Sequence, residues 1–324
     1  MTVDAVRLKT IGDCLEFGIR LFDNAKLTFG HGTTNARDEA AYLILHTLGL
    51  PLDVFDHTRR LSDAEASAIT SIFKQRVALR IPAAYLTQEA WLGKFKFFVD
   101  ERFIVPRSFI AELLNKKLSS WAENPKVVTD VLELCTGSGC LAILASHAFP
   151  NAKIIASDIS AEALAVAKIN VKNYDLDARI SLIKSDLFRG VPKKPYDLII
   201  ANPPYVDAAA MRALPKEYRH EPKLALAGGA NGLTLVQHII DNAADFLKER
   251  GILIVEIGHH RSMLKKMYPH MQFCWPKTPG GNGYVFILER EKLVRMQSAR
   301  KSKAGKIKET RAPSPRENAS RNEP

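Results

Sequence analysis

An unusual proline-rich turn follows the apolar run at residues 196–201, and it consists of Asn202, Pro203, Pro204 and Tyr205. The two prolines supply no N–H group and lock the backbone, so a strand predicted for the apolar run must end there. The turn leaves the Asn202 side chain and the Pro203 carbonyl facing the space beyond the strand. Both can accept hydrogen bonds from a planar –NH2 group, and Tyr205 offers a flat face beside it. The turn therefore predicts chemistry on an amide or exocyclic amine nitrogen.

A glycine-rich loop occurs upstream, where residues 133–140 have the sequence Glu-Leu-Cys-Thr-Gly-Ser-Gly-Cys after another apolar run. Glycines allow the backbone to approach a ligand closely. The loop lacks the third glycine of the dinucleotide fingerprint and the Gly-Lys-Ser/Thr of a P-loop. Taken alone, it is weak evidence for a nucleoside site.

Two carboxylates follow the next two apolar runs. Asp158 lies 21 residues beyond Gly137 and can bind the hydroxyls of a ribose, but it could also cap the next helix, a role for which Ser160 competes. Asp186, followed by Leu187, can accept a hydrogen bond from an adenine amino group, although a lone Asp is often a turn residue. The order of glycine loop, two carboxylates and Asn-Pro-Pro-Tyr is more specific than any of its members.

Residues 106–290 must position these side chains, and they alternate strands with helices. Strands are predicted at residues 127–134, 152–158, 180–186, 198–201, 252–257 and 284–288, and helices at 106–114, 141–147 and 161–173. Apolar strands that alternate with helices predict a mainly parallel α/β sheet covered on both faces. In such sheets ligands bind beyond the carboxyl ends of the strands, where the loops described above lie.

Residues 1–90 are predicted to be helical. Val6, Ile11, Leu15, Ile19 and Phe22 recur at helical spacing. A second helix is predicted at residues 39–46, and Ser62 with Glu65 forms a capping box that opens a third. The pattern is compatible with a plain helical bundle and with a substrate-docking domain.

Residues 91–105 are aromatic and β-branched, interrupted by the polar residues 100–102. This pattern predicts a β-hairpin that turns at residues 100–102 and connects the two domains.

The net charge of +11 is concentrated at the carboxyl end, because residues 291–324 contain ten Lys or Arg and four Glu. This basic tail has few large apolar residues, so we expect it to be disordered. It is a candidate for contact with ribosomal RNA or another polyanion, or it is a solvated extension. No apolar run is long enough to span a membrane, and no signal peptide is recognisable. The four cysteines lack metal-ligand spacing, so we expect a cytoplasmic protein with reduced thiols and no metal site.

The combined pattern resembles the S-adenosylmethionine-dependent methyltransferases, over roughly residues 91–290. Within that class the chain is similar to the bacterial protein-(glutamine-N5) methyltransferases, which modify peptide release factors or ribosomal protein L3. The Glu-Pro…Ala-Leu…Gly-Gly pattern at 221–229 is shared by both branches. Three features favour the branch that modifies the ribosomal protein: residues 103–113, the Tyr-x-x-Glu-Pro-Lys-Leu-Ala-Leu form at 218–226, and Glu-Leu-Cys at 133–135. The resemblance implies an α/β fold, a Rossmann-like seven-stranded class I methyltransferase domain with a small N-terminal helical domain. Together with the patterns above, it gives four parts: a helical substrate-docking domain (1–90), a hairpin connector (91–105), the methyltransferase domain (106–290) and the basic tail (291–324).

The resemblance also implies an S-adenosyl-L-methionine site and an amide pocket. The implied cofactor residues are Glu133, Cys135, Thr136, Gly137, Ser138, Gly139, Asp158, Asp186, Leu187 and Asn202. The implied catalytic residues are Asn202, Pro203, Pro204 and Tyr205.

Three other functions are compatible with the same residues. Release factors are the nearest alternative substrate for a glutamine methyltransferase. An adenine-N6 methyltransferase of nucleic acid also needs a planar amine pocket, and base flipping would suit a basic protein. A non-catalytic ribosome-assembly factor could keep the same fold. The intact Asn202–Tyr205 turn argues against this alternative, because nothing in the fold needs the turn.

Overall fold

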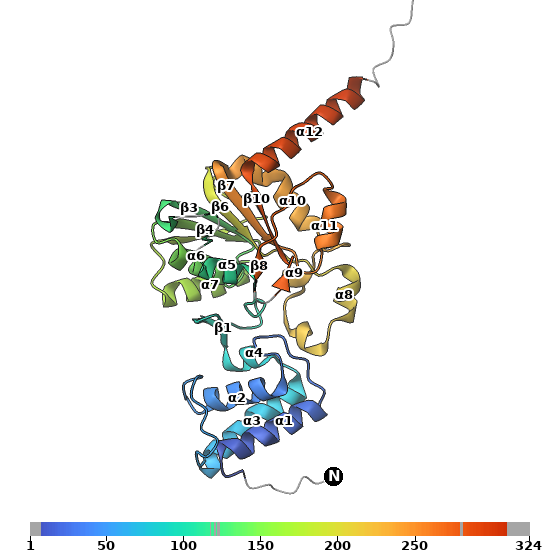
Figure 1. Ribbon diagram of the computed structural model, residues 1–324. Coiled ribbons are helices and arrows are strands. Elements are labelled where there is room, and N and C mark those ends of the chain that lie inside the picture. Colours follow the sequence, from blue (N-terminus) through green and yellow to red (C-terminus); the bar gives the residue numbers. More distant parts are fainter. Residues whose placement is uncertain (1–7, 117, 120, 122–123, 279–280, 310–324) are drawn as a thin grey trace, which may run out of the picture.

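The protein consists of a small helical unit and a larger α/β unit arranged end to end (Figure 1). The computed structural model describes residues 8–116, 118–119, 121, 124–278 and 281–309. The helical unit lies at the amino-terminal end, and helix α12 (Arg290–Glu309) projects from the opposite end of the α/β unit. The functional loops lie between these two extremes.

The helical unit is built from elements that begin where the sequence supplies caps. It comprises α1 (Ile11–Asn24), α2 (Ala36–Thr47), α3 (Asp63–Leu79) and the short α4 (Ala83–Thr87). The predicted capping box of Ser62 and Glu65 is confirmed at the start of α3, and Thr10 forms another with Asp13 at the start of α1. The helix at residues 39–46 is confirmed within α2.

The predicted apolar stripe of α1 forms the core of this unit. Ile11, Leu15 and Phe22 are buried, and the Phe22 ring meets that of Phe73 edge to face at 5.1 Å between centroids. Ile19 is half-buried, and Val6 lies outside the described residues.

The connecting hairpin lies earlier in the chain than the sequence analysis predicted. Strands β1 (Glu89–Leu92) and β2 (Phe95–Phe98) are antiparallel, with Leu92 opposite Phe95. The predicted turn at residues 100–102 is therefore wrong. A two-residue hairpin turn needs a left-handed backbone, which Gly93 supplies at φ 62°. Residues 103–105 lie outside the strands.

The main sheet of the described chain has the order β5-β4-β3-β6-β7-β10. Neighbouring strands are parallel except β10, which is antiparallel to β7. The strands are β3 (Asp130–Leu134), β4 (Lys153–Asp158), β5 (Ile180–Lys184), β6 (Tyr196–Ala201), β7 (Leu247–Glu256) and β10 (Val285–Glu289). All six correspond to predicted strands.

A seventh strand position is present as a single bridge. Cys274 pairs with Ile287 of β10 through two backbone hydrogen bonds of 3.1 and 2.8 Å, antiparallel to it. The described sheet therefore has six strands and one bridge at its β10 edge, and the predicted Rossmann-like architecture is otherwise retained.

Helices cover both faces of the sheet. One apolar layer includes α5 (Ile110–Asn115), α6 (Cys140–Ala148) and α7 (Ala161–Asn173). The other includes α10 (Thr234–Asn242), α11 (Arg261–Met267) and the start of α12. Burial on both faces explains why the strands are apolar almost throughout.

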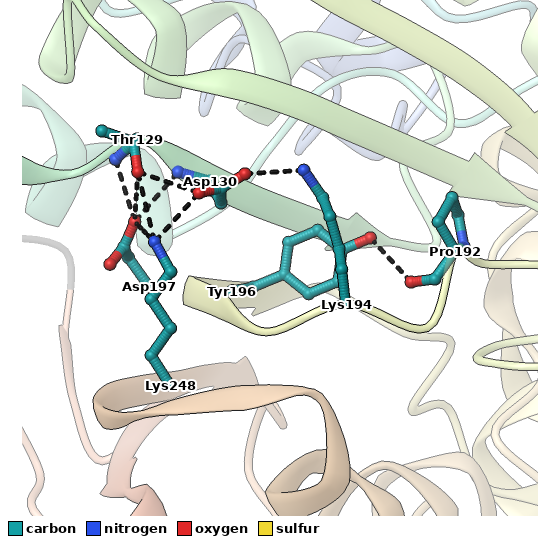
Figure 2. A network of polar contacts seen from close by, with 7 residues as sticks. All are labelled: Thr129, Asp130, Pro192, Lys194, Tyr196, Asp197 and Lys248. Atoms are coloured by element: carbon teal, nitrogen blue, oxygen red, sulfur yellow. Dashed lines mark hydrogen bonds and ion pairs between the residues drawn. The ribbon is translucent and has the colours of Figure 1, made fainter.

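A polar network joins the amino-terminal ends of three strands (Figure 2). The Lys248 Nζ lies 2.9 Å from both Asp130 Oδ2 and Asp197 Oδ2, and Lys194 Nζ lies 2.6 Å from Asp130 Oδ1. Asp197 Oδ2 also accepts the backbone N–H of Thr129 at 2.9 Å. These contacts hold β3, β6 and β7 in register at the edge opposite the functional loops.

The basic tail differs in part from the prediction. Residues 290–309 form helix α12, so disorder beginning at residue 291 is wrong; residues 310–324 lie outside the described part. Leu293 is fully buried against the sheet, and Gln297 Nε2 donates to the Asp241 carbonyl at 2.9 Å. Contacts with the α/β unit therefore order a helix that its own composition would not stabilise.

Short elements complete the fold. The segment after β6 contains α8 (Ala208–Ala213), the 3-10 helix η2 (Lys216–His220) and α9 (Lys223–Leu226). The remaining elements are η1 (Pro125–Val127), η3 (Ala243–Phe246), β8 (Lys277–Thr278) and β9 (Gly281–Asn282). No helix among the described residues is both long and apolar enough to cross a membrane.

Candidate active site

The Asn202–Tyr205 turn leaves the carboxyl end of β6 in the middle of the sheet and is held from its far side by a second segment. Val206 N donates to the Leu226 carbonyl at 2.9 Å, and Gly228 N donates to the Val206 carbonyl at 2.8 Å. A Cβ on Gly228 would lie 2.6 Å from Tyr205 Cα and 2.8 Å from the Pro204 carbonyl oxygen. The glycine is therefore needed for this close approach.

The turn lines a cavity of about 190 Å³, here called the turn cavity, together with Arg107 and Tyr218. Asn202 Nδ2 donates to the Arg107 carbonyl at 3.4 Å, which orients the amide. Among the described residues no donor reaches Asn202 Oδ1 or the Pro203 carbonyl. Both acceptors that the sequence predicted thus remain available beside the cavity.

Tyr205 is held at both ends. Its hydroxyl donates to Glu256 Oε1 at 3.2 Å, and its carbonyl lies 2.8 Å from His260 Nε2. Burial raises the pKa of Tyr205 well above its ordinary value, so the phenol stays neutral. His260 therefore supports the turn.

A second cavity of about 220 Å³, here called the loop cavity, lies beyond the carboxyl ends of β3, β4 and β5. Predicted cofactor residues that line it are Cys135, Asp158, Asp186, Leu187 and Asn202. The two cavities share four lining residues, which are Ile104, Asn202, Pro204 and Ala225. The structure thus brings the predicted nucleoside loops and the predicted amide pocket to a common wall.

Asp158 lies at the centre of the loop region. Its Oδ2 accepts the Gly137 N–H at 2.9 Å and its Oδ1 accepts the Ser160 N–H at 2.9 Å. Burial raises the pKa of Asp158. The Ser160 side chain, and not Asp158, caps α7 by accepting the Ala163 N–H. The competing interpretation of Asp158 as the helix cap is therefore wrong.

Asp186 is the most open of the predicted carboxylates in this region. Its side chain is 46% exposed and lies 3.1 Å from Arg189 Nη1. The backbone then turns at Leu187, where φ is 49°. Asp186 and Leu187 therefore enter the loop cavity from a sharp turn after β5.

The other five predicted cofactor residues, Glu133, Thr136, Gly137, Ser138 and Gly139, are not among those that line the loop cavity. Thr136 Oγ1 donates to Glu133 Oε2 at 2.6 Å within the loop, and burial raises the pKa of Glu133 to about 8. Gly137 is covered by the ring of Phe103, because a Cβ there would lie 1.8 Å from Phe103 Cζ. These residues support the conformation of the loop without lining the loop cavity.

Several side chains at the site are not among the residues predicted from the sequence. Phe103 covers the glycine loop and lines the loop cavity, while Arg107 and Tyr218 line the turn cavity. The buried carboxylate of Glu256 binds Tyr205. The available signal for Glu256 was a charged residue ending an apolar strand, the same signal that identified Asp158.

Two buried glutamates after β6 connect the site to the helical unit. Glu221 accepts two hydrogen bonds from Arg107, and its Oε1 lies 3.7 Å from the Nε2 of buried His31. Burial alone would raise the pKa of Glu221, but the hydrogen bonds from Arg107 outweigh it and hold the pKa at about 2. The His31 ring also packs on Tyr218, with 4.3 Å between centroids.

Glu217 makes the second connection. Its Oε1 accepts from Arg80 Nη1 at 2.8 Å and from the Thr28 N–H at 3.1 Å, and it lies 3.9 Å from Arg76 Nη1. The helical unit is thus attached directly to the segment that bounds the turn cavity.

Comparisons with known proteins agree with this arrangement. The family described as methyltransferase small domain matches residues 111–217. Among solved structures, the hMettl16 catalytic domain in complex with the MAT2A 3'UTR hairpin 1 is similar in fold. Its TM-score is 0.50 at 14% identity, with 78% of this chain and 91% of that chain covered.

Relatives extend the match over the whole fold. A protein of Neisseria gonorrhoeae named ribosomal protein uL3 glutamine methyltransferase is 53% identical, over 90% of this chain and 97% of its own. A protein of the same name from Burkholderia pseudomallei is 50% identical, over 90% of this chain and 98% of its own. The predicted fold, the enzyme class and the methyl donor S-adenosylmethionine are confirmed. The chain belongs to the family of ribosomal protein uL3 glutamine methyltransferases.

Proposed function

We propose that this enzyme transfers a methyl group from S-adenosylmethionine to the side-chain amide nitrogen of a glutamine in ribosomal protein uL3. The observation that carries the proposal is the common wall of the two cavities, where Asn202 and Pro204 line both. A methyl donor in the loop cavity and an amide in the turn cavity would meet at this wall. The names of the relatives support uL3 as the substrate.

The loop cavity fits the donor chemically. Asp158 presents a carboxylate to the cavity for ribose hydroxyls, and it is held by the N–H groups of Gly137 and Ser160. Asp186 and Leu187 supply a hydrogen-bond acceptor and an apolar flank for the adenine. When bound, S-adenosylmethionine supplies an electrophilic, positively charged methyl sulfonium.

The turn cavity supplies what an amide nucleophile lacks. A glutamine nitrogen is a poor nucleophile because its lone pair is delocalised into the carbonyl. Asn202 Oδ1 and the Pro203 carbonyl would accept its two N–H groups, hold the nitrogen in place and favour the positive charge that develops on it. This is positioning together with electrostatic preorganisation, and it requires no general base before transfer. The nitrogen–methyl bond would form as the methyl–sulfur bond breaks, with the neutral thioether as leaving group, and the nitrogen, now acidic, would lose its proton afterwards.

The remaining residues of the turn would flank the amide plane. Pro203 and Pro204 have no N–H group that could compete with the substrate N–H groups for the Asn202 Oδ1 and Pro203 carbonyl oxygens. Tyr205 is neutral and fixed through its hydroxyl and its carbonyl. Its ring can stack on the flat amide.

The decisive experiment measures transfer of labelled methyl from S-adenosylmethionine to uL3, a release factor and DNA offered in parallel. We expect label on a glutamine of uL3, lost in Asn202→Ala while donor binding by calorimetry is retained. Asn151→Ala is the matched control, because its side chain only donates to the Lys126 carbonyl at an exposed site. Label confined to the release factor or to DNA would overturn the substrate assignment, and full turnover by Asn202→Ala would overturn the site.

We further propose that the helical unit docks the substrate protein. The contacts of Glu217 with Arg80 and Thr28 support this role, since they attach that unit to the segment beside the turn cavity. Glu217→Ala should raise KM for uL3 severalfold and leave the Kd of the donor unchanged. Exposed Glu249→Ala is the control, and an unchanged KM in Glu217→Ala would contradict the docking role.

The basic carboxyl end is the proposed contact for ribosomal RNA. Residues 291–324 carry ten Lys or Arg against four Glu, and α12 projects away from the helical unit. Truncation after residue 300 removes seven Lys or Arg and three Glu, and it should reduce both the RNA affinity and its dependence on salt. Since ribosomal proteins meet RNA during assembly in the cytoplasm, we place the enzyme there.

A further inference from the structure

Glu256 ends strand β7 beside the turn cavity, and its carboxylate is almost fully buried, with 1% of the residue exposed. It accepts three hydrogen bonds from two directions. The Tyr205 hydroxyl donates to Oε1 at 3.2 Å, whereas Ser108 Oγ at 2.6 Å and the Phe109 N–H at 2.9 Å donate to Oε2.

The three partners require an acceptor at both oxygens. The Phe109 N–H can only donate, and Ser108 Oγ already accepts the Ile110 N–H at 3.1 Å, so its proton points to Glu256. A carboxylate satisfies all three donors, while an amide at this position would place an NH2 group against at least one of them. Glu256 is therefore matched to these neighbours by chemistry as well as by size.

The partners of Glu256 belong to two segments that each contribute a lining residue, Tyr205 or Arg107, to the turn cavity. Tyr205 comes from the turn after β6, and Ser108 follows Arg107, whose carbonyl receives the Asn202 side-chain N–H. One buried carboxylate thus connects the flat ring beside the amide pocket with the segment that orients Asn202.

We propose that Glu256 is a positioning residue for methyl transfer, which sets the Tyr205 ring and the 107–109 segment against the substrate amide. The inference rests on the proposed function and adds a residue outside the Asn202–Tyr205 turn. Glu256 does not touch the reacting atoms; it acts through Tyr205 and Ser108. Misplacement of a positioning group by about 1 Å can cost about a hundredfold in rate.

The test uses Glu256→Gln, Tyr205→Phe and the double variant in the full-length chain, with uL3 as the methyl acceptor. We expect Glu256→Gln to lower kcat about tenfold to a hundredfold, with KM and the donor Kd changed less than about twofold. In the Tyr205→Phe background the same substitution should cost clearly less, because part of its effect passes through the missing hydroxyl. Tyr196→Phe, which removes a buried hydroxyl bonded to the Pro192 carbonyl, controls for the loss of a tyrosine hydroxyl.

Wild-type kcat in Glu256→Gln, or fully additive losses in the double variant, would overturn the inference. If Glu256→Gln does not fold, Tyr205→Phe alone decides, because it removes the same hydrogen bond from the other side; unchanged kcat there would also overturn it.

A second measurement needs no protein substrate, so it separates this inference from the proposed function. With 3-fluorotyrosine at position 205, the fluorine resonance should shift or broaden in Glu256→Gln and stay unchanged in Tyr196→Phe. A resonance indifferent to Glu256→Gln would refute the positioning role even if uL3 proved not to be the substrate. Absence of label on uL3 with the wild-type enzyme would refute the proposed function alone.

Discussion

Arg107 and Glu221 form a bidentate ion pair, with 2.6 Å between Nη1 and Oε1 and 2.7 Å between Nη2 and Oε2. Glu221 Oε1 also accepts the Val105 N–H at 3.0 Å. The pair joins the segment leading out of the hairpin to the segment after η2, and Arg107 itself lines the turn cavity. The site therefore depends on an ion pair between the buried Glu221 carboxylate and the half-buried Arg107, more than a hundred positions apart in the chain.

Loss of this pair should destabilise the whole enzyme. In Glu221→Gln the half-buried Arg107 loses its charged partner, and a hydrogen bond between charged groups is typically worth about 1.5–3 kcal/mol. We expect the free energy of unfolding in urea at pH 7 to fall by that amount. Glu16→Gln is the control, because Glu16 pairs with Arg37 at a site where both side chains are more than half exposed, and it should change little.

The same pair predicts an acid limit of stability. The pKa of Glu221 is held at about 2, below its ordinary value of 4.5, so its contribution is present above pH 4.5 and is lost as the pH falls toward 2. The difference in unfolding free energy between wild type and Glu221→Gln should shrink over that window. A difference independent of pH would show that Glu221 does not act through its charge.

Asp158 should control binding of the donor. Asp158→Ala removes the carboxylate that lines the loop cavity and accepts the Gly137 N–H. A charged hydrogen bond is typically worth about 1.5–3 kcal/mol, so we expect S-adenosylmethionine to bind about tenfold to a hundredfold more weakly. Calorimetry measures this directly, with exposed Asp177→Ala as the control. Equal affinity in both variants would remove Asp158 from the cofactor site.

Gly137 and Gly49 have similar φ angles, so a comparison of alanine at the two positions separates backbone strain from steric contact with neighbouring atoms. Gly137 has φ +57° and would place a Cβ against the Phe103 ring, whereas Gly49 has φ +62° with no atom within 4 Å of such a Cβ. Alanine at either position costs about 1 kcal/mol of backbone strain. Gly137→Ala should cost more than that in unfolding free energy and should also weaken donor binding, while Gly49→Ala leaves the Kd unchanged. Equal effects of the two variants would mean that Phe103 does not restrict the loop.

The pH dependence of activity should report Glu256. Burial raises its pKa to about 7, and only the ionised carboxylate accepts from all three donors. We expect kcat to rise with pH through an inflection near 7 in the wild type, and this inflection should be absent in Glu256→Gln. An identical inflection in both proteins would assign it to another group.

Stability should respond to Glu256 in the opposite sense. Because the folded pKa lies above the ordinary value of 4.5, the stabilisation is complete below pH 4.5 and is lost as the pH rises through about 7. Urea unfolding of wild type and Glu256→Gln across this range measures the difference. A wild-type stability that rises with pH relative to the variant would contradict the assignment.

Sequence patterns predicted the helices and strands correctly where interactions between neighbouring residues determine them. The capping box of Ser62 and Glu65 begins a helix at the predicted residue. The apolar runs at residues 152–158 and 252–257 form the predicted strands of the main sheet. The hairpin turn was misplaced because polar residues at 100–102 look like a turn, whereas a left-handed glycine at position 93 makes one. The tail was misjudged because Leu293 and Gln297 are ordered by the α/β unit, which composition does not reveal.

By itself the sequence determined the parts of this enzyme that depend on neighbouring residues. It placed Asn202–Tyr205 after a strand, Asp158 and Asp186 after two others, and glycines at 137 and 139, because strand periodicity and proline and glycine chemistry act over a few residues. Only the tertiary structure decided that Glu256 reaches Tyr205, that Arg107 pairs with Glu221, and that Phe103 covers Gly137. These contacts join segments far apart in the chain, and their partners depend on how the sheet and the helical unit pack together.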